Sequence, residues 1–137
     1  MKVRSMDETL DLIEKFHGHL GPYVVLGYRI GLIANEKLGK DPFSKNAIVY
    51  TGNTPPISCM VDGIQLSSGC TLGKGNIKII DNKQAIAEFS NKSNETLRIR
   101  LKDSVKEEID TTVTEENIVF YSQNLWKKND EHLFEIL

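Results

Sequence analysis

The sequence predicts an α+β domain in which helices cover a mixed β-sheet. Its elements run in the order helix, helix, strand, helix, three strands and then helices, without the regular alternation of a doubly wound α/β fold. Residues 20–38 are apolar nearly all round a helical wheel, as in a buried helix. Residues 96–101 alternate apolar and charged side chains, as in a strand with one solvated face. A chain of 137 residues is long enough to bury one such core.

The first helix is predicted over residues 6–16. Asp7 suits its N-cap, and Leu10, Ile13 and Phe16 recur on one face. The run HGHLGP that follows holds two glycines and a proline in six residues, so we expect the helix to end there.

The second helix is predicted over about residues 20–38. Pro22 suits its first turn, where a missing N–H costs no hydrogen bond, and Gly39 suits its end. Gly27, Gly31 and Ala34 share a face that carries no bulky side chain. Because each glycine lowers helix propensity, we expect this face to serve the close approach of another backbone.

The rest of the chain is predicted as short strands and helices, bounded by turns rich in Gly, Pro, Asn and Asp. The predicted strands are residues 47–51, 76–80, 85–90 and 96–101, and the predicted helices are residues 57–67, 105–109 and 115–124. The helix over 57–67 has Met60 and Ile64 on its core face, with Cys59 and Asp62 on the opposite side, one turn apart.

Charge and composition exclude several classes of protein. A net charge of −2 without a basic run gives no footprint for general nucleic-acid binding. The first ten residues lack the apolar segment of a signal peptide, and the longest apolar stretch is interrupted by Arg29 and too short to span a bilayer. Two cysteines make no disulfide framework, so both should be reduced thiols. We expect a soluble, cytoplasmic protein without a membrane partner.

Side chains with metal-binding chemistry fall in two short segments. His17 and His19 flank Gly18, and Cys59 and Cys70 lie eleven residues apart. Together they supply the nitrogen and sulfur donors that a zinc-like ion prefers. The alternative is that the histidines are satisfied by backbone hydrogen bonds and the cysteines act as small buried hydrophobic residues.

Asp62 is the single charged residue among positions 46–73, although 26% of the whole chain is charged. Such an isolated acid in a segment rich in glycine and cysteine is a candidate for proton transfer. The alternative is a carboxylate that caps a helix or faces solvent.

The glycine-rich run 69–76 resembles a phosphate-binding loop only in composition. It lacks the GxxxxGK[ST] pattern, and it follows a predicted helix instead of a strand. Its backbone amides together with Lys74 are still suited to an anion. The alternative is a turn that needs glycine for its backbone angles.

Two blocks of sequence, FHGHLGPYVVLGYR (16–29) and CMVDGIQLSSGCTLGKGN (59–76), resemble the E-subunit family of formylmethanofuran dehydrogenase. The resemblance covers about residues 6–101 of a single domain over residues 1–137, with 102–137 as a helical extension. It implies a fold like the catalytic domain of glyceraldehyde-3-phosphate dehydrogenase. It also implies a homodimer, partnership with a larger molybdenum or tungsten enzyme, and a role related to methanogenesis.

The resemblance implies a metal-binding pocket. This sequence differs from the family pattern at two points that concern the pocket. Gly21 stands where the family has a cysteine, and no cysteine follows Cys70, whereas many members carry a C-terminal zinc finger. The implied ligands of a divalent metal, zinc by preference, are His17, His19, Cys59 and Cys70. Asp62 is the implied proton shuttle, and Gln65, Thr71, Lys74 and Asn76 are the implied ligand-binding residues.

Three functions follow from these residues. The first is a metal-binding domain that acts on or binds a C1 carrier or a similar anionic small molecule. The second is a non-catalytic accessory or assembly subunit that kept the fold and lost the metal chemistry. The third is a cofactor sensor. The sequence is compatible with an enzyme and with a protein that only binds its ligand.

Overall fold

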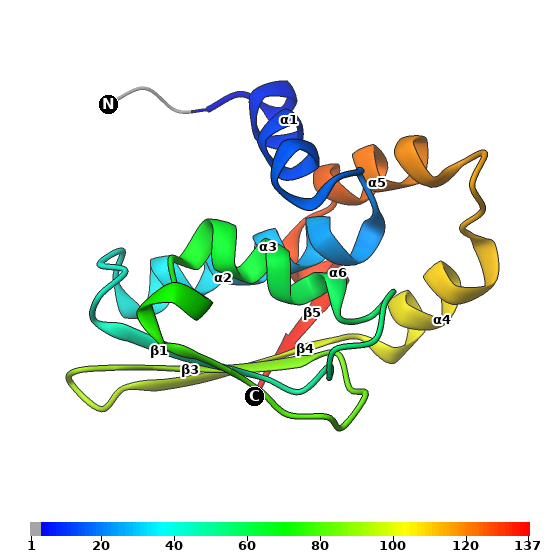
Figure 1. Cartoon of the computed structure of the whole chain (residues 1–137). Helices are drawn as coiled ribbons and strands as arrows, with labels where there is room; N and C mark the ends of the chain where they lie inside the picture. The colour runs from blue at the N-terminus through cyan, green and yellow to red at the C-terminus, as the bar shows by residue number, and fades with distance from the viewer. Residues whose placement is uncertain (1–3) are drawn as a thin grey trace.

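The computed structural model describes residues 4–137, which fold into helices packed on one five-stranded sheet (Figure 1). The helices are α1 (Met6–His17), α2 (Pro22–Leu38), α3 (Cys59–Ser68), α4 (Asp103–Thr112), α5 (Ile118–Lys127) and α6 (Asp130–Leu133), with a short 3₁₀ turn over Leu72–Lys74. The strands are β1 (Lys45–Val49), β2 (Ile77–Ile79), β3 (Ile86–Asn91), β4 (Thr96–Leu101) and β5 (Phe134–Ile136).

The sheet is mixed, as the sequence predicts. Its strand order is β2-β1-β3-β4-β5, with β1 and β2 parallel and the other neighbours antiparallel. One face is covered by α2 and α3, which lie side by side above it in Figure 1. The other face carries ion pairs between half-exposed side chains, Arg98 with Glu88 and Arg100 with Glu135. The alternation over residues 96–101 therefore separates a core face from a solvated face, as expected.

The main core lies between the sheet and the two helices α2 and α3. Its fully buried members include Leu26 and Ile30 from α2, Met60 and Ile64 from α3, and Phe89 from β3. A second apolar cluster joins Leu10 and Ile13 of α1 to the start of α2, whereas Phe16, predicted on the same face, is exposed. Within residues 4–137, no helix is both long enough and apolar enough to cross a bilayer.

Helices α2 and α3 pack through glycine, as the small-residue face of α2 predicts. A Cβ atom added to Gly27 would lie 2.1 Å from the carbonyl oxygen of Met60. A Cβ added to Gly63 would lie 2.1 Å from the carbonyl oxygen of Val24. The two backbones are in contact, so neither position has room for a larger residue. This contact fixes the position of Cys59 and Asp62 relative to the start of α2.

The C-terminal extension differs from the sequence prediction in its extent. The two helices predicted over 105–109 and 115–124 span Asp103–Thr112 and Ile118–Lys127, and α6 and β5 follow. Strand β5 pairs with β4 and completes the edge of the sheet. Arg29 of α2 ties this extension to the core. It donates to the Trp126 carbonyl at 2.8 Å and to the Asp130 carboxylate at 2.7 Å.

Candidate functional site

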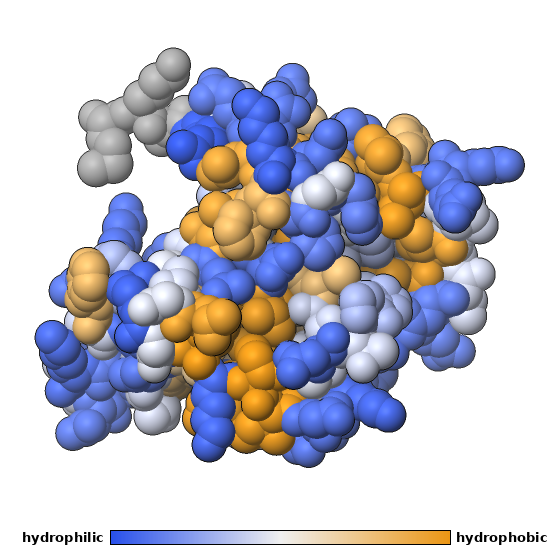
Figure 2. Space-filling model, viewed as in Figure 1, coloured by the Kyte–Doolittle hydropathy of each residue, from blue (hydrophilic) through white to orange (hydrophobic). Residues whose placement is uncertain are grey.

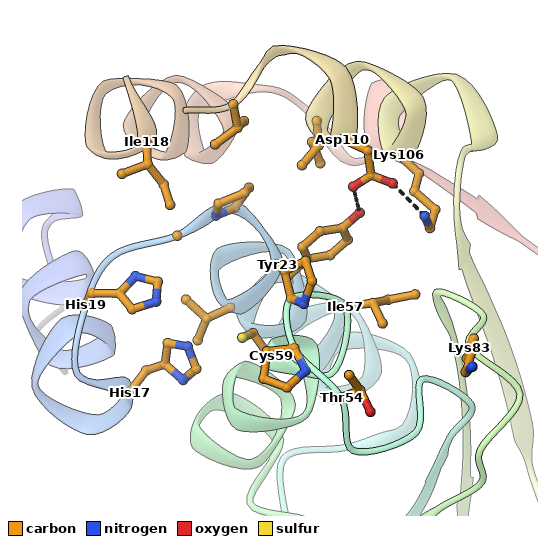
Figure 3. Close-up of a pocket in the computed structure, with 17 residues that line it drawn as sticks. His17, His19, Tyr23, Thr54, Ile57, Cys59, Lys83, Lys106, Asp110 and Ile118 are labelled. Carbon is orange, nitrogen blue, oxygen red and sulfur yellow. Dashed lines mark hydrogen bonds and ion pairs between the residues drawn. The ribbon is translucent and has the colours of Figure 1, made fainter. Parts of the chain in front are cut away.

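A pocket of about 790 Å³ opens where the turn between α1 and α2 meets the start of α3 and the helices α4 and α5 (Figure 3). Most of its wall is apolar, and its histidines and its lysines lie toward opposite ends. The lining residues are His17, His19, Gly21, Pro22, Tyr23, Val24, Thr54, Pro55, Pro56, Ile57, Cys59, Lys83, Lys106, Ile109, Asp110, Val113 and Ile118. Figure 2 shows apolar surface (orange) gathered over the middle of the face seen in Figure 1, between hydrophilic margins.

At one end of the pocket, a side chain of α1 is hydrogen-bonded to a side chain of α3. His17 is the last residue of α1, and Asp62 lies one turn into α3. The Nδ1 atom of His17 lies 2.6 Å from Oδ2 of Asp62. A carboxylate accepts hydrogen bonds, so Nδ1 carries a proton, and in the neutral ring the other nitrogen, Nε2, has a free lone pair. The His17 side chain is only 11% exposed, which limits its freedom to leave this geometry.

His19 and Cys59 line the same end of the pocket. The ring centroids of His17 and His19 are 5.1 Å apart, and Cys59 opens α3 (Figure 3). Burial, followed by the nearby charge of Asp62, raises the pKa of the Cys59 thiol. A raised pKa keeps this sulfur protonated at neutral pH when no metal or cation is bound to it.

Gly21, the position at which the sequence resemblance implies a cysteine, lies against the His19 ring. A Cβ atom added to Gly21 would lie 3.0 Å from Cε1 of His19 and 3.4 Å from its Nδ1. The His19 ring therefore lies against the space that a side chain at position 21 would enter. A cysteine there would need His19 to move.

Lysine and acidic side chains form the opposite end of the pocket. The Tyr23 hydroxyl donates to Oδ1 of Asp110 at 2.6 Å, and the Lys106 ammonium donates to Oδ2 of the same carboxylate at 2.6 Å. Burial and then the hydrogen bond to Asp110 raise the pKa of the Tyr23 phenol, so it remains a proton donor. Lys83 lies at this end as well (Figure 3).

Cys70 lies apart from the other three predicted metal ligands. Cys59 begins α3 and Cys70 follows its end, so at about 1.5 Å per residue the helix separates them by roughly 15 Å. Cys70 is fully buried in the main core, and burial raises the pKa of its thiol. In the described part of the chain, no three His, Cys, Asp or Glu side chains are grouped so as to hold a metal ion.

The predicted ligand-binding residues also lie outside the pocket lining, and they form hydrogen bonds with other protein groups. Gln65 accepts from the Leu72 amide, and Asn76 accepts from the Thr71 amide. Lys74 donates to the Thr71 hydroxyl at 2.8 Å. Of the predicted site residues, the structure thus brings His17, His19, Cys59 and Asp62 together, and it places the loop residues and Cys70 elsewhere.

The lysine end of the pocket was not predicted from the sequence. Lys83 sits in a turn and Lys106 on an amphipathic helix, where a lysine is ordinarily a solvated surface charge. No short motif joins them to the histidines. Their common position depends on how the turn after β2 and the helix α4 pack around the start of α2.

Known proteins place this fold in a family. The family model described as "FmdE, Molybdenum formylmethanofuran dehydrogenase operon" matches residues 16–135, which is most of the chain. The chain belongs to the FmdE family. The match includes the His17 turn, the α3 helix and the glycine-rich loop on which the sequence resemblance rests.

A solved FmdE-like structure shares the fold. The crystal structure of a tungsten formylmethanofuran dehydrogenase E-subunit (FmdE)-like protein from Syntrophus aciditrophicus is similar over 100% of this chain and 76% of that chain. The TM-score is 0.70 at 20% sequence identity. The comparison supports the FmdE-like α+β architecture. The finer likeness to the catalytic domain of glyceraldehyde-3-phosphate dehydrogenase stays a prediction.

The name of one curated relative includes a ligand. A "Probable S-adenosyl-L-methionine-binding protein" from Archaeoglobus fulgidus is 39% identical over 75 residues, which is 50% of this chain. The matched region is only 19% of that protein, so most of the relative has no counterpart in the alignment.

Proposed function

We propose that this FmdE-family chain binds a small organic molecule of the C1-carrier type in the pocket between α1, α3 and α4. The volume of about 790 Å³ lies in the range of roughly 300–1,000 Å³ typical of small-molecule sites. Mostly apolar walls with a few polar groups at the ends are also typical of such sites. The observation that carries the proposal is the His17–Asp62 pair, which aims an oriented imidazole at this pocket.

In this proposal His17 exchanges a proton with the bound molecule. Asp62 holds Nδ1–H at 2.6 Å, so Nε2 accepts a proton from the ligand or a ligand-bound water. The imidazolium formed in this step is stabilised by the Asp62 carboxylate. Asp62, predicted as the proton shuttle itself, acts here through His17 as a positioning residue. Cys59 lies beside this end of the ligand as a neutral thiol.

A divalent metal ion, zinc by its preference for nitrogen and sulfur ligands, is the second candidate for the same end of the pocket. His17, His19 and Cys59 would hold it, and it would polarise an oxygen atom of the ligand or of water. A carboxylate bonded to a histidine, as Asp62 is to His17, usually accompanies a metal-bound histidine. The donor types fit zinc, but their positions do not form a ready site, so no step is assigned to a metal.

The metal candidate has a direct test. Protein prepared without chelator or nickel resin is analysed for bound zinc before and after dialysis against zinc. About one zinc per chain, lost in Cys59→Ser and kept in Cys70→Ser, supports the candidate. A content near zero that Cys59→Ser leaves unchanged contradicts it.

An accessory subunit or a cofactor sensor is the alternative to an enzyme, and both would use the same pocket for binding without turnover. The family resemblance suggests a homodimer for either function, and a complex with a molybdenum or tungsten enzyme would suit the accessory subunit. Pull-down that finds no larger partner, together with turnover of a C1 carrier, would favour an enzyme.

Calorimetric titration tests the binding proposal. The ligands are 5-formyltetrahydrofolate, a C1 carrier, and S-adenosyl-L-methionine, which the name of the curated relative suggests. Thr54→Trp fills the pocket from an exposed position, and Thr96→Trp adds the same ring to an exposed position on the sheet. Binding of the C1 carrier that is lost in Thr54→Trp and kept in Thr96→Trp supports the proposal. Absence of binding, or equal binding by both variants, contradicts it.

A further inference from the structure

We infer that Lys83 and Lys106 form an anion-binding subsite at the end of the pocket opposite His17. The ligand then carries a carboxylate or phosphate at one end and its reactive group at the other. This inference rests on the proposed small-molecule function and adds the charge and orientation of the ligand. Among the side chains labelled in Figure 3, those of His17, His19 and Cys59 lie toward one end of the pocket. Those of Lys83, Lys106 and Asp110 lie toward the other end.

The backbone around Lys83 is anchored on both sides. The Gly52 amide donates to the Ile80 carbonyl at 3.0 Å, and the Gln84 amide donates to the Tyr50 carbonyl at 3.0 Å. Residues Thr51 and Asp81 also form an isolated antiparallel bridge. The turn is therefore fixed against the loop that leads to α3, and the backbone that carries Lys83 is held in place beside the pocket.

The charges at this end do not cancel. Asp110 is engaged at both oxygens, by the Tyr23 hydroxyl and by Lys106. Among the residues that the structure describes, Lys83 takes part in no ion pair. The lining of this end of the pocket thus holds two lysine ammonium groups and one carboxylate, which leaves a net positive charge. An anionic group of a ligand would complete this arrangement.

The charges that line the pocket also favour an anionic ligand over a cationic one. Asp110 already accepts hydrogen bonds at both of its oxygens, and Asp62, which accepts one from His17, is not among the residues that line the pocket. A cationic ligand such as the sulfonium of S-adenosyl-L-methionine therefore meets no unpaired carboxylate in the pocket lining. The pocket therefore favours a ligand with an acidic tail. The anion site predicted from sequence at Lys74 lies outside the pocket lining, and Lys74 is bonded to Thr71.

A pair of fluorescent probes separates the charge from the apolar contact. The probes are 1-anilinonaphthalene-8-sulfonate and its uncharged analogue N-phenyl-1-naphthylamine, which lacks the sulfonate. Affinities are measured for the native chain, Lys83→Gln, and Lys78→Gln, which removes an equal charge from an exposed strand position. Thr54→Trp reports how much of each signal comes from the pocket.

The expected result is a loss of about three- to tenfold in affinity for the sulfonate probe in Lys83→Gln, with the uncharged probe unchanged. Lys78→Gln should leave both affinities unchanged, and added salt should weaken only the sulfonate probe. If both probes bind in the pocket and Lys83→Gln changes the affinity for neither, the anion-binding subsite is disproved while the proposed small-molecule binding stands. If Thr54→Trp affects neither probe, the pocket is not a binding site and both proposals fail.

Discussion

His17 and Asp62 are 45 residues apart in the chain, yet their side chains meet at 2.6 Å where the end of α1 lies against the first turn of α3. The contact depends on the packing of α3 against α2 through Gly27 and Gly63, because that packing sets where Asp62 points. The packing of α3 on α2 in the core thereby helps to determine which ring nitrogen of His17 carries the proton. The proposed chemistry of the pocket follows from this pair.

Replacing Asp62 by Asn should accelerate alkylation of Cys59. Burial and the charge of Asp62 both raise the pKa of this thiol above its usual value of about 9, so little thiolate exists at pH 8. Removing the charge lowers the pKa and increases the thiolate fraction at that pH. We expect the rate with iodoacetamide at pH 8 to rise roughly two- to fivefold. The rate for native protein should climb with pH, and most steeply above pH 9.

Peptide mass spectrometry provides the controls for this experiment. Cys70 is fully buried and should stay unmodified in the folded protein. Asp7→Asn removes a carboxylate at the far end of α1 and should leave the Cys59 rate unchanged. An unchanged or slower rate in Asp62→Asn would contradict the assigned influence of Asp62.

Gly27→Ala should destabilise the fold by about 3 kcal/mol, because the added methyl group would overlap the Met60 carbonyl and force α2 and α3 apart. The free energy of unfolding is measured by urea denaturation. Gly73→Ala is the matched control, since a Cβ atom there meets nothing within 4 Å, and its cost should stay within about 0.5 kcal/mol. Equal stability of the two variants would disprove the close helix contact.

Lys83→Asn should stabilise the protein while it weakens anion binding. Lys83 has a φ of 53°, in the left-handed region that Asn tolerates better than Lys. We expect the free energy of unfolding to rise by about 0.5–1 kcal/mol. Lys92→Asn, at an exposed turn position where φ is not positive, should not stabilise the protein. A loss of stability in Lys83→Asn would contradict the strained backbone.

Arg29→Ala should cost about 2–3 kcal/mol, since it removes charge-assisted hydrogen bonds that join α2 to the C-terminal extension. The guanidinium also lies 5.6 Å from the centre of the Trp126 ring. Arg98→Ala breaks a half-exposed pair with Glu88 and should cost less than about 1 kcal/mol. Thermal unfolding of both variants checks the difference, and an Arg29 variant as stable as the Arg98 variant would refute this role.

The fold was largely predictable because its signals are local. The apolar circumference of α2, the core face of α3 and the alternation in β4 are each visible within a few residues of sequence. The small face of Gly27 and Gly31 correctly predicted a close helix contact. Strand β5 was not predicted, because three residues form it only by pairing with the distant strand β4.

The site was predictable only in part, because residue type does not specify distance. His17, His19, Cys59 and Asp62 were selected by their chemistry, and the fold gathers them. Cys70 is grouped with them by its donor chemistry and by the family resemblance, but it follows the far end of α3 and lies in the core. Lys83 gave no signal, since an exposed lysine in a turn is indistinguishable from a solvated charge until the packing is known.

The most direct measurement is long-range ¹H–¹⁵N NMR of the histidine rings during titration with 5-formyltetrahydrofolate. In the free protein we expect His17 to be protonated at Nδ1, and Asp62→Asn to remove that preference. The ligand should shift the ring signals of His17 and His19 and leave His132, on α6 outside the pocket, unchanged. A His17 ring protonated at Nε2 in the free protein, or ligand binding that leaves the His17 signals in place, would contradict the account.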